Sequence, residues 1–433
     1  MGRVSVASKD VIRGSQSIMA MKRCFMQLIA LLLGAIPLVN CSDAPSCVLA
    51  GADSPIRSVS RIPAAAGGCP VGSGGGGGGN GGCSNTLTPA DVVFAQASTG
   101  AITTLAIKTP VGTNLSLMCT TATAGLGQIA VANVLATNKN FLYALSTVAG
   151  TINGFAIGHV APTTLTPVGS AFSIFAANGL HTVVEMQADP SGRFLTVTDT
   201  VSSHVHVLLI DSSLGTLREA AGSPFTIANA LFTAVGTTGQ FLYVTDQSDA
   251  EIRIFSINLT SPTQALTELV TFSPFIEPSG NPANAPISMQ VNSAGTFLYT
   301  ANTSSISFYS IDPTNGSLSG TGSPLNFTPA FDPQQLTTDT TGSFLYARGA
   351  GLEGVLGFTI NANGSLTLIS TTPFASGASV TDMLVNPLGG QMYFLVAGAI
   401  DVFTIDPVSG ALAAVSSTTH FSSSSNLAAA KVQ

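Results

Sequence analysis

Short runs of β-branched and aromatic residues, separated by small polar turns, recur along most of the chain. The stretch from Ile287 to Phe327 shows the pattern most clearly, with four runs of three to six such residues. Each gap between the runs carries the Gly, Asn, Asp or Pro that a tight turn requires, whereas the runs have the composition of strands. The pattern predicts one antiparallel unit of four strands.

Two independent markers repeat along the chain with the same count. The first is a run related to Gly-x-Phe-Leu-Tyr, whose seven copies lie at Asp91–Phe94 and around Tyr143, Thr196, Tyr243, Tyr299, Tyr346 and Tyr393. The second is a leucine after the last turn of each unit, at Leu115, Leu165, Leu217, Leu266, Leu318, Leu366 and Leu412. Four-stranded repeats of about 40 to 50 residues are typical of propeller blades. The sequence therefore predicts an all-β, seven-bladed β-propeller over residues 85–433.

The two ends of the repeat array complement each other. The first repeat begins at its second strand, and the last repeat is followed by an extra apolar segment, Asn426–Gln433. We predict that this segment supplies the missing inner strand of the first blade and closes the ring. Closure of this kind removes exposed sheet edges.

The composition argues against a nucleic-acid partner. Charged residues make up 8% of the chain, the formal net charge is −7, and the mean hydropathy is +0.44. A surface that binds nucleic acid needs a basic patch, which this composition does not supply. No second domain interrupts the repeats, so we expect a single ring of seven blades. We also expect a monomer and no cofactor.

The first 41 residues have the features of an export leader. Lys22 and Arg23 follow Met21, which we take as the true start, and an apolar run from Phe25 to Val39 comes next. The run is short for a membrane-spanning helix and fits a signal peptide. It ends in Leu-Val-Asn-Cys at Cys41, which resembles the lipobox of bacterial lipoproteins. We expect lipidation of Cys41 and a place in the cell envelope, periplasmic or on the outer surface. Ordinary secretion or a retained anchor is the alternative.

Residues 42–84 form a segment without any period, in which six consecutive glycines begin at Gly74. Such a chain behaves as flexible coil, and roughly 43 residues have an r.m.s. reach of about 35 to 40 Å, so we expect a tether. The segment lacks the strand, helix and Lys-Ser or Lys-Thr pair of a phosphate-binding loop. The pairing of Cys47, Cys69, Cys83 and Cys119 is left open.

The stretch from His181 to Leu217 carries a family resemblance. A histidine precedes the expected inner strand, a DPSGRF turn follows that strand, and Asp199 closes the next one. In this order the residues resemble the repeat of the seven-bladed lactonase family, which is similar to bacterial 6-phosphogluconolactonase, to fungal carboxymuconate cyclase and to other YVTN-repeat propellers. The resemblance covers residues 85–433 and implies hydrolytic opening of a lactone. Where cyclase-type members carry arginines in the following blades, this chain has Asn229, Ala230 and Leu231.

Three residues are candidates for catalysis. Because consecutive strands are antiparallel, the start of each inner strand and the end of each second strand lie on one face. His181, Asp199 and Arg348 would then occupy equivalent positions around one mouth of the channel, where ligands of propellers bind. Ring-opening hydrolysis could use His181 as general base, Asp199 to orient it and Arg348 to hold an anionic group. Each also has a structural alternative, since Asp199 can cap its loop, His181 can be a hydrogen-bonding group and Arg348 can pair with an acid.

Further polar residues are candidates for ligand binding. Asp246 and Asn302 end second strands, as Asp199 does, and Glu185 lies within an apolar inner strand. A carboxylate in that position must be hydrogen-bonded, linked to water or protonated. His204 and His206 alternate along one strand, but no third ligand is spaced to complete a metal site, so we expect no metal.

Two function classes follow from these residues. One is a lactonase-like hydrolase that acts on a sugar lactone or related ester, and the other is a non-catalytic surface propeller that binds a glycan or a protein. In either case we expect contact with the membrane through a lipid anchor only. Asp211, Asp312 and Asp406 each open a turn that closes with Gly, so we interpret them as turn formers rather than catalytic acids.

Overall fold

The computed structural model describes the repeat region in the segments 91–97, 101–107, 115–122, 128–146, 150–158, 165–174, 183–246, 249–276, 286–320, 322–327, 331–370, 372–375, 377–396, 399–420 and 424–431. Contacts divide the chain into two units, Met1–Ala64 and Ala65–Gln433, and every described residue belongs to the second. The export leader with Cys41, the Gly-rich tether and His181 lie outside the described residues. Over these segments the elements are strands, and no helix there is long and apolar enough to cross a membrane.

The described strands form seven antiparallel sheets. The sheet in the order β3-β2-β1-β31 contains β1 (Asp91–Ala97), β2 (Ala101–Ile107), β3 (Leu115–Ala122) and β31 (Ser424–Lys431). The next contains β4 (Ile129–Val134), β5 (Lys139–Ser146), β6 (Thr151–Ile157) and β7 (Leu165–Ser173). The third contains β8 (Val183–Ala188), β9 (Phe194–Asp199), β10 (His204–Ile210) and β11 (Leu217–Glu219), with β12 (Phe225–Thr226) paired to β10.

The other four sheets repeat this order along the chain. The fourth contains β13 (Ala230–Val235), β14 (Phe241–Asp246), β15 (Glu251–Ile257), β16 (Leu266–Glu268) and β17 (Phe275–Ile276). The fifth contains β18 (Ser288–Val291), β19 (Phe297–Asn302), β20 (Ser305–Ile311), β21 (Leu318–Gly320) and β22 (Leu325–Asn326). The sixth contains β23 (Pro333–Thr338), β24 (Phe344–Gly349), β25 (Val355–Ile360) and β26 (Leu366–Leu368). The seventh contains β27 (Val380–Val385), β28 (Gln391–Val396), β29 (Ala399–Ile405) and β30 (Leu412–His420).

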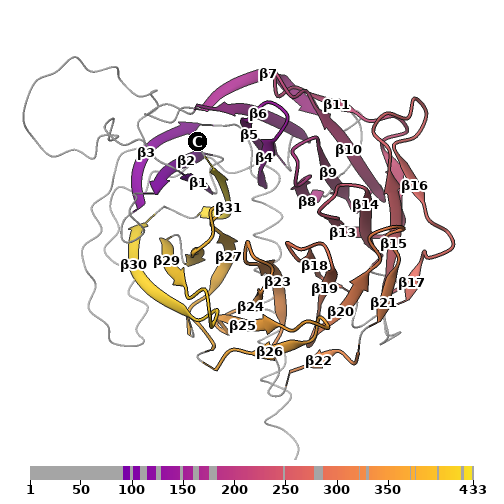
Figure 1. Ribbon diagram of the computed structural model, residues 1–433. Helices are drawn as coiled ribbons and strands as arrows, with labels where there is room; N and C mark the ends of the chain where they lie inside the picture. Colours follow the sequence, from indigo (N-terminus) through magenta and orange to yellow (C-terminus); the bar gives the residue numbers. More distant parts are fainter. Residues whose placement is uncertain are drawn as a thin grey trace, which may run out of the picture. The chain divides into compact units, whose positions relative to one another are not determined.

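In Figure 1 the sheets follow one another around a common centre, with β4, β8, β13, β18, β23, β27 and β31 innermost. Each of these strands contacts the innermost strands of its two neighbouring sheets, and β31 contacts both β27 and β4. β31 pairs with β1 from Asp91↔Lys431 to Ala97↔Ser424. The prediction of an all-β propeller is confirmed.

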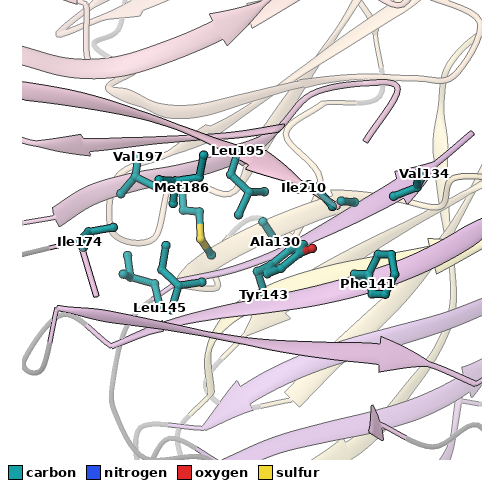
Figure 2. Close-up of a cluster of buried hydrophobic side chains, with 13 residues drawn as sticks. Ala130, Val134, Phe141, Tyr143, Leu145, Ile174, Met186, Leu195, Val197 and Ile210 are labelled. Atoms are coloured by element: carbon teal, nitrogen blue, oxygen red, sulfur yellow. The ribbon is translucent and has the colours of Figure 1, made fainter. Parts of the chain in front are cut away.

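Apolar side chains fill the spaces between neighbouring sheets. Because a sheet has a neighbour on each face, its second strand is buried on both sides, and all six residues of β14 are buried. Figure 2 shows one such space, in which Ala130 and Tyr143 from the sheet of β4–β7 lie with Met186 and Leu195 from the sheet of β8–β11. The core is therefore divided among the blade interfaces, where burial of apolar area stabilises the contact between blades.

The repeated tyrosines and glycines join neighbouring blades. Each hydroxyl donates to a glycine carbonyl in the turn before the outer strand of the next blade, from Tyr143 to Gly215 (2.8 Å), Tyr243 to Gly316 (3.0 Å), Tyr299 to Gly364 (2.9 Å) and Tyr346 to Gly410 (2.8 Å). The phenylalanine two residues before the tyrosine packs on the same glycine, so that a Cβ on Gly364 would lie 2.6 Å from the ring of Phe297. Gly364 also has a φ of +84°, which favours glycine. The tyrosine of the first sequence marker and the turn glycine just before the leucine of the second thus form the two sides of one contact between blades.

The acids that open the turns hold those turns by hydrogen bonds. The Oδ1 atom of Asp211 accepts from the backbone N–H groups of Ser213 (2.9 Å) and Leu214 (2.8 Å). Asp312 and Asp406 accept in the same way from groups two and three residues further on. These hydrogen bonds lower the pKa of each carboxyl group, and the interpretation of the three residues as turn formers is confirmed.

Candidate functional site

Asp199 ends β9, and its carboxylate is directed into the turn that follows. The side chain is fully buried, Oδ1 accepts from the N–H of Val201 (3.1 Å), and Oδ2 accepts from the hydroxyl of Ser202 (2.6 Å). Hydrogen bonds of this kind are how an Asp stabilises the turn after a strand. The geometry thus favours the loop-capping alternative for Asp199, while its expected partner His181 lies outside the described residues.

Asp246 and Asn302 occupy the same position as Asp199, at the ends of β14 and β19. Both are buried. The amide nitrogen of Asn302 donates to the hydroxyl of Ser307 (2.9 Å), whereas its Oδ1 atom is buried and has no hydrogen-bond partner among the described residues. A buried acceptor without a partner costs free energy, so Asn302 Oδ1 is a place where a ligand or water donor would be stabilised.

Arg348 lies one residue away from the expected position. It faces Gln335 across β23 and β24, and Gly349 is the residue that ends β24 where Asp199 ends β9. The expected equivalence of Arg348 with Asp199 is therefore wrong by one residue, because both strands have six residues and Arg348 is the fifth of its strand, as Thr198 is of β9. The Arg348 guanidinium donates from Nε to Gln335 Oε1 (3.3 Å) and from Nη1 to the carbonyl of Val380 (3.2 Å).

The carboxylate beside Arg348 is Asp382 on β27, a residue that was not predicted from the sequence. Its Oδ1 atom accepts from Gln335 Nε2 (2.7 Å) and its Oδ2 atom from the N–H of Leu427 on β31 (2.7 Å). Burial raises the pKa of Asp382, although these hydrogen bonds and the charge of Arg348 act in the opposite direction. Burial likewise lowers the pKa of Arg348, and Asp382 opposes that shift. Gln335 thus holds a cation and an anion of neighbouring blades in one cluster.

Asp382 belongs to a set of side chains at one repeat position of the innermost strands. Each accepts the backbone N–H of the next innermost strand, and the bonds run from Met186 to Gln128 Oε1 (2.6 Å), Thr233 to Glu185 Oε2 (2.6 Å), Leu336 to Ser288 Oγ (3.2 Å), Met383 to Gln335 Oε1 (3.2 Å) and Leu427 to Asp382 Oδ2 (2.7 Å). Those N–H groups are on the edge of each sheet that has no further strand, so the side chains replace a missing ladder partner. A signal for this set exists in the sequence, because Glu185 precedes the turn residue Asp189 by four residues, as Asp382 precedes Asn386.

The ionisation of Glu185, another member of this set, is also shifted toward the neutral form. Burial raises the pKa of Glu185 to about 7, and the hydrogen bonds from the N–H and hydroxyl of Thr233 offset only part of that shift. Both bonds go to Oε2, and within the described residues Oε1 makes no hydrogen bond. Glu185 is hydrogen-bonded, as a carboxylate inside an apolar strand requires, and it keeps one oxygen available.

The two histidines on β10 belong to the outer part of their blade. His206 Nδ1 lies 2.9 Å from Glu219 Oε1, and the other oxygen of Glu219 accepts from the hydroxyl of Ser223. The ring of His204 meets that of His206 edge-on at 6.2 Å between centroids. Over the described part of the chain, no group of three His, Cys, Asp or Glu residues is placed to hold a metal. Glu219 is thus the partner of His206.

The fold and this set of side chains define an all-β propeller with ionisable groups along its innermost strands. A family model described as "Lactonase, 7-bladed beta-propeller" matches residues 229–380. Among solved structures, a candidate 6-phosphogluconolactonase from Bacteroides fragilis is similar with a TM-score of 0.61 and 17% identity, over 80% of this chain and 99% of that chain. The periplasmic gluconolactonase of Pseudomonas aeruginosa is similar with a TM-score of 0.61 and 15% identity, over 79% of this chain and 99% of that chain. At these identities the likeness shows the fold. None of the curated proteins matches the chain.

Proposed function

We propose that the chain is a lactonase-like propeller that hydrolyses a cyclic ester, either a sugar lactone or a related compound, in its channel. The observation that carries the proposal is the cluster of Arg348, Gln335 and Asp382 on two neighbouring blades. A guanidinium that is held in place can bind the carbonyl or carboxylate oxygen of a substrate and stabilise charge that develops there. The similarity of the fold to lactonase propellers supports this class of reaction.

The reaction adds water to the carbonyl carbon of the lactone and releases the ring oxygen as a hydroxyl group. In our proposal His181 takes the proton from water, and Arg348 stabilises the oxyanion of the tetrahedral intermediate. The proton then goes to the ring oxygen as the C–O bond breaks, so that water and lactone give one hydroxy acid. Asp199 takes no proton in this scheme, because its carboxylate already holds its own turn.

Hydrolysis of sugar lactones and simple aryl esters by the purified protein tests the proposal. We expect Arg348→Ala and His181→Ala to lower kcat/KM by about 100-fold or more, the scale of removing an oxyanion-binding or proton-transfer group. Arg253→Ala is the matched control, because Arg253 pairs with Glu268 in the outer part of its blade. If no lactone or ester is hydrolysed by the unaltered protein, the chain belongs instead to the class of propellers that bind a glycan or protein without catalysis.

The proposal includes an exported protein that is anchored through Cys41. It is supported by the basic residues, apolar run and lipobox-like end of the leader. Expression with labelled palmitate tests the anchor, and we expect label in the unaltered chain, none in Cys41→Ser, and unchanged label in the control Cys47→Ser. Release of an unlipidated form from the unaltered chain would contradict the anchor and support ordinary secretion.

The proposal also includes a single closed ring of seven blades. It is supported by the pairing of β31 with β1 and by the contacts of β31 with β4 and β27. A closed ring leaves no innermost strand without a neighbour, which agrees with a channel that is surrounded on all sides.

A further inference from the structure

One member of the repeat position is neither polar nor hydrogen-bonded to its neighbour. This position lies four residues before the turn or at the equivalent place in the strand register. Most blades have a polar residue there, namely Gln128, Glu185, Ser288, Gln335 or Asp382. The fourth blade has Phe232 of β13 instead. A phenylalanine cannot accept the N–H of the next strand. The fourth blade therefore has an aromatic side chain at a position where its neighbours use polar side chains to join innermost strands.

Phe232 is also unusual among the phenylalanines of the chain. It is half-buried, and among the described phenylalanines it alone belongs to none of the hydrophobic clusters between the blades. The pairing of β13 with β14 shifts between Ala230 and Thr233, so Phe232 lies in a bulge that β8, β23 and β27 also have at this position. Bulges redirect side chains and recur beside functional sites. The backbone of the bulge is held, since the N–H of Phe232 donates to Thr245 Oγ1 (2.9 Å).

The carboxylate of Glu185 lies next to the backbone of this bulge. Glu185 Oε2 is 2.6 Å from the backbone nitrogen of Thr233, which is the residue that follows Phe232. The side chain opposite Glu185 on β9 is Thr198, and no charged group contributes to the raised pKa of Glu185. An aromatic residue and a hydrogen-bond acceptor with one available oxygen are thus neighbours on adjacent innermost strands.

We infer that Phe232 and Glu185 form a subsite for a neutral, hydroxylated ring, the chemistry of a sugar or of an unphosphorylated sugar lactone. The C–H face of such a ring packs on an aromatic face, and its hydroxyl groups donate to a carboxylate oxygen. A phosphorylated ring is excluded from this subsite, because the subsite contributes a carboxylate and no cation. The assignment of the sugar lactone as reactant rests on the proposed function, whereas binding of the ring does not.

Fluorescence measures binding at Phe232 directly, because the chain has no tryptophan. Phe232→Trp places a single reporter in the subsite, and Phe225→Trp places one at a half-buried phenylalanine of the outer strand β12 as the matched control. The probes are δ-gluconolactam, the methyl glycosides of glucose, galactose and mannose, and 6-phosphogluconate. We expect saturable changes at position 232 with at least one neutral probe, none with 6-phosphogluconate and none at position 225. Absence of a response to all neutral probes, or an equal response at both positions, would overturn the inference.

Glu185→Gln tests the carboxylate without breaking the contact between blades. The amide oxygen of a glutamine can accept the N–H of Thr233, as Gln128 accepts that of Met186 one blade earlier. We expect affinity for the neutral probe, measured by calorimetry, to rise with pH around 7 in the unaltered protein because the ionised carboxylate is the stronger acceptor. In Glu185→Gln we expect affinity about 5- to 20-fold weaker at pH 8 and independent of pH. Glu219→Gln, on an outer strand, is the control, and an unchanged pH profile in Glu185→Gln would overturn the role of Glu185.

Kinetics separates this inference from the proposed function. If the protein hydrolyses lactones, Phe232→Ala should raise KM while leaving kcat within a factor of two, and Phe232→Tyr should restore KM. Hydrolysis that is unaffected by both Phe232→Ala and Glu185→Gln would overturn the subsite and leave the proposed function intact. Binding of a neutral ring at position 232 without hydrolysis of any lactone would support the subsite and remove the proposed activity.

Discussion

At the scale of single residues, the contact between a tyrosine and the next blade is a measurable part of the stability. The Tyr299 hydroxyl is buried and donates to the carbonyl of Gly364, and burial raises the pKa of that hydroxyl far above its usual range. Tyr299→Phe removes the hydroxyl donor, so the carbonyl of Gly364 loses this hydrogen bond. We expect a loss of about 1 kcal/mol in the free energy of unfolding, measured by urea denaturation. Ser319→Ala, at an exposed position of β21, is the control and should be neutral.

The glycine in the same contact should be more sensitive than the tyrosine. Gly364→Ala combines a φ of +84° with a Cβ only 2.6 Å from the Phe297 ring, whereas Gly351→Ala has a φ of +56° and no atom within 4 Å of its Cβ. We expect about 1 kcal/mol for Gly351→Ala from backbone strain alone and about 2 to 4 kcal/mol for Gly364→Ala from strain and overlap together. Equal losses in the two variants would show that the ring of Phe297 moves aside without cost.

The raised pKa of Glu185 predicts how stability depends on pH. A carboxyl group whose pKa is about 7 in the folded chain and near 4.3 in the unfolded chain binds more protons when folded between these values. Its contribution to stability is therefore present at pH 4 to 5 and is lost as the pH rises through 7. We expect the difference in Tm between unaltered protein and Glu185→Gln to change by a few degrees between pH 5 and pH 8, with Glu185→Gln relatively more stable at pH 8. A difference independent of pH would contradict the raised pKa.

At the scale of elements, Asp382 should fix the C-terminal strand in place. It accepts the N–H of Leu427 on β31 and is bonded to Gln335 on β23, so one side chain connects three innermost strands. Asp382→Ala leaves buried donors unpaired, and we expect a loss of about 2 to 4 kcal/mol, measured by urea denaturation. Asp382→Asn should lose less, because its amide oxygen still accepts from Leu427. Deletion of residues 424–433 should be the most severe change, since β1 then loses its partner strand.

Strands and turns were predictable from the sequence for a local physical reason. Runs such as Phe241–Asp246 alternate with turns whose Asp and Gly residues have fixed hydrogen-bonding and backbone requirements, so neither depends on distant contacts. Aligning the six-residue runs that begin at Phe194 and Phe344 already matches Arg348 with Thr198. The runs do not show the pairing between strands, because a bulge between Pro333 and Gln335 places Gln335 opposite Arg348. A bulge leaves no clear mark in a single sequence.

At the scale of the whole molecule, the channel was harder to read from the sequence than the blades. Its wall is built from innermost strands that are about 50 residues apart in the chain, and the repeat gives them similar patterns. Asp382 looked like an ordinary residue of an apolar strand, because its partners Gln335 and Leu427 come from two other sheets. Phe232 departs from the polar residues that the other blades described above have at its repeat position.

The charge of the whole molecule predicts a preference between two substrates that differ by a phosphate group. The formal net charge is −7. Asp199 and Asp246 end second strands, Glu185 and Asp382 lie on innermost strands, and Arg348 is a cation beside Asp382. Such a field repels a dianion, and salt screens it over about 8 Å at physiological ionic strength. If the protein opens lactones, we expect kcat/KM at 20 mM salt to be about tenfold or more higher for gluconolactone than for its 6-phosphate. We expect this ratio of the two kcat/KM values to be smaller at 300 mM salt. A preference for the phosphorylated lactone at both salt concentrations would contradict this electrostatic account and point to a basic group outside the described residues.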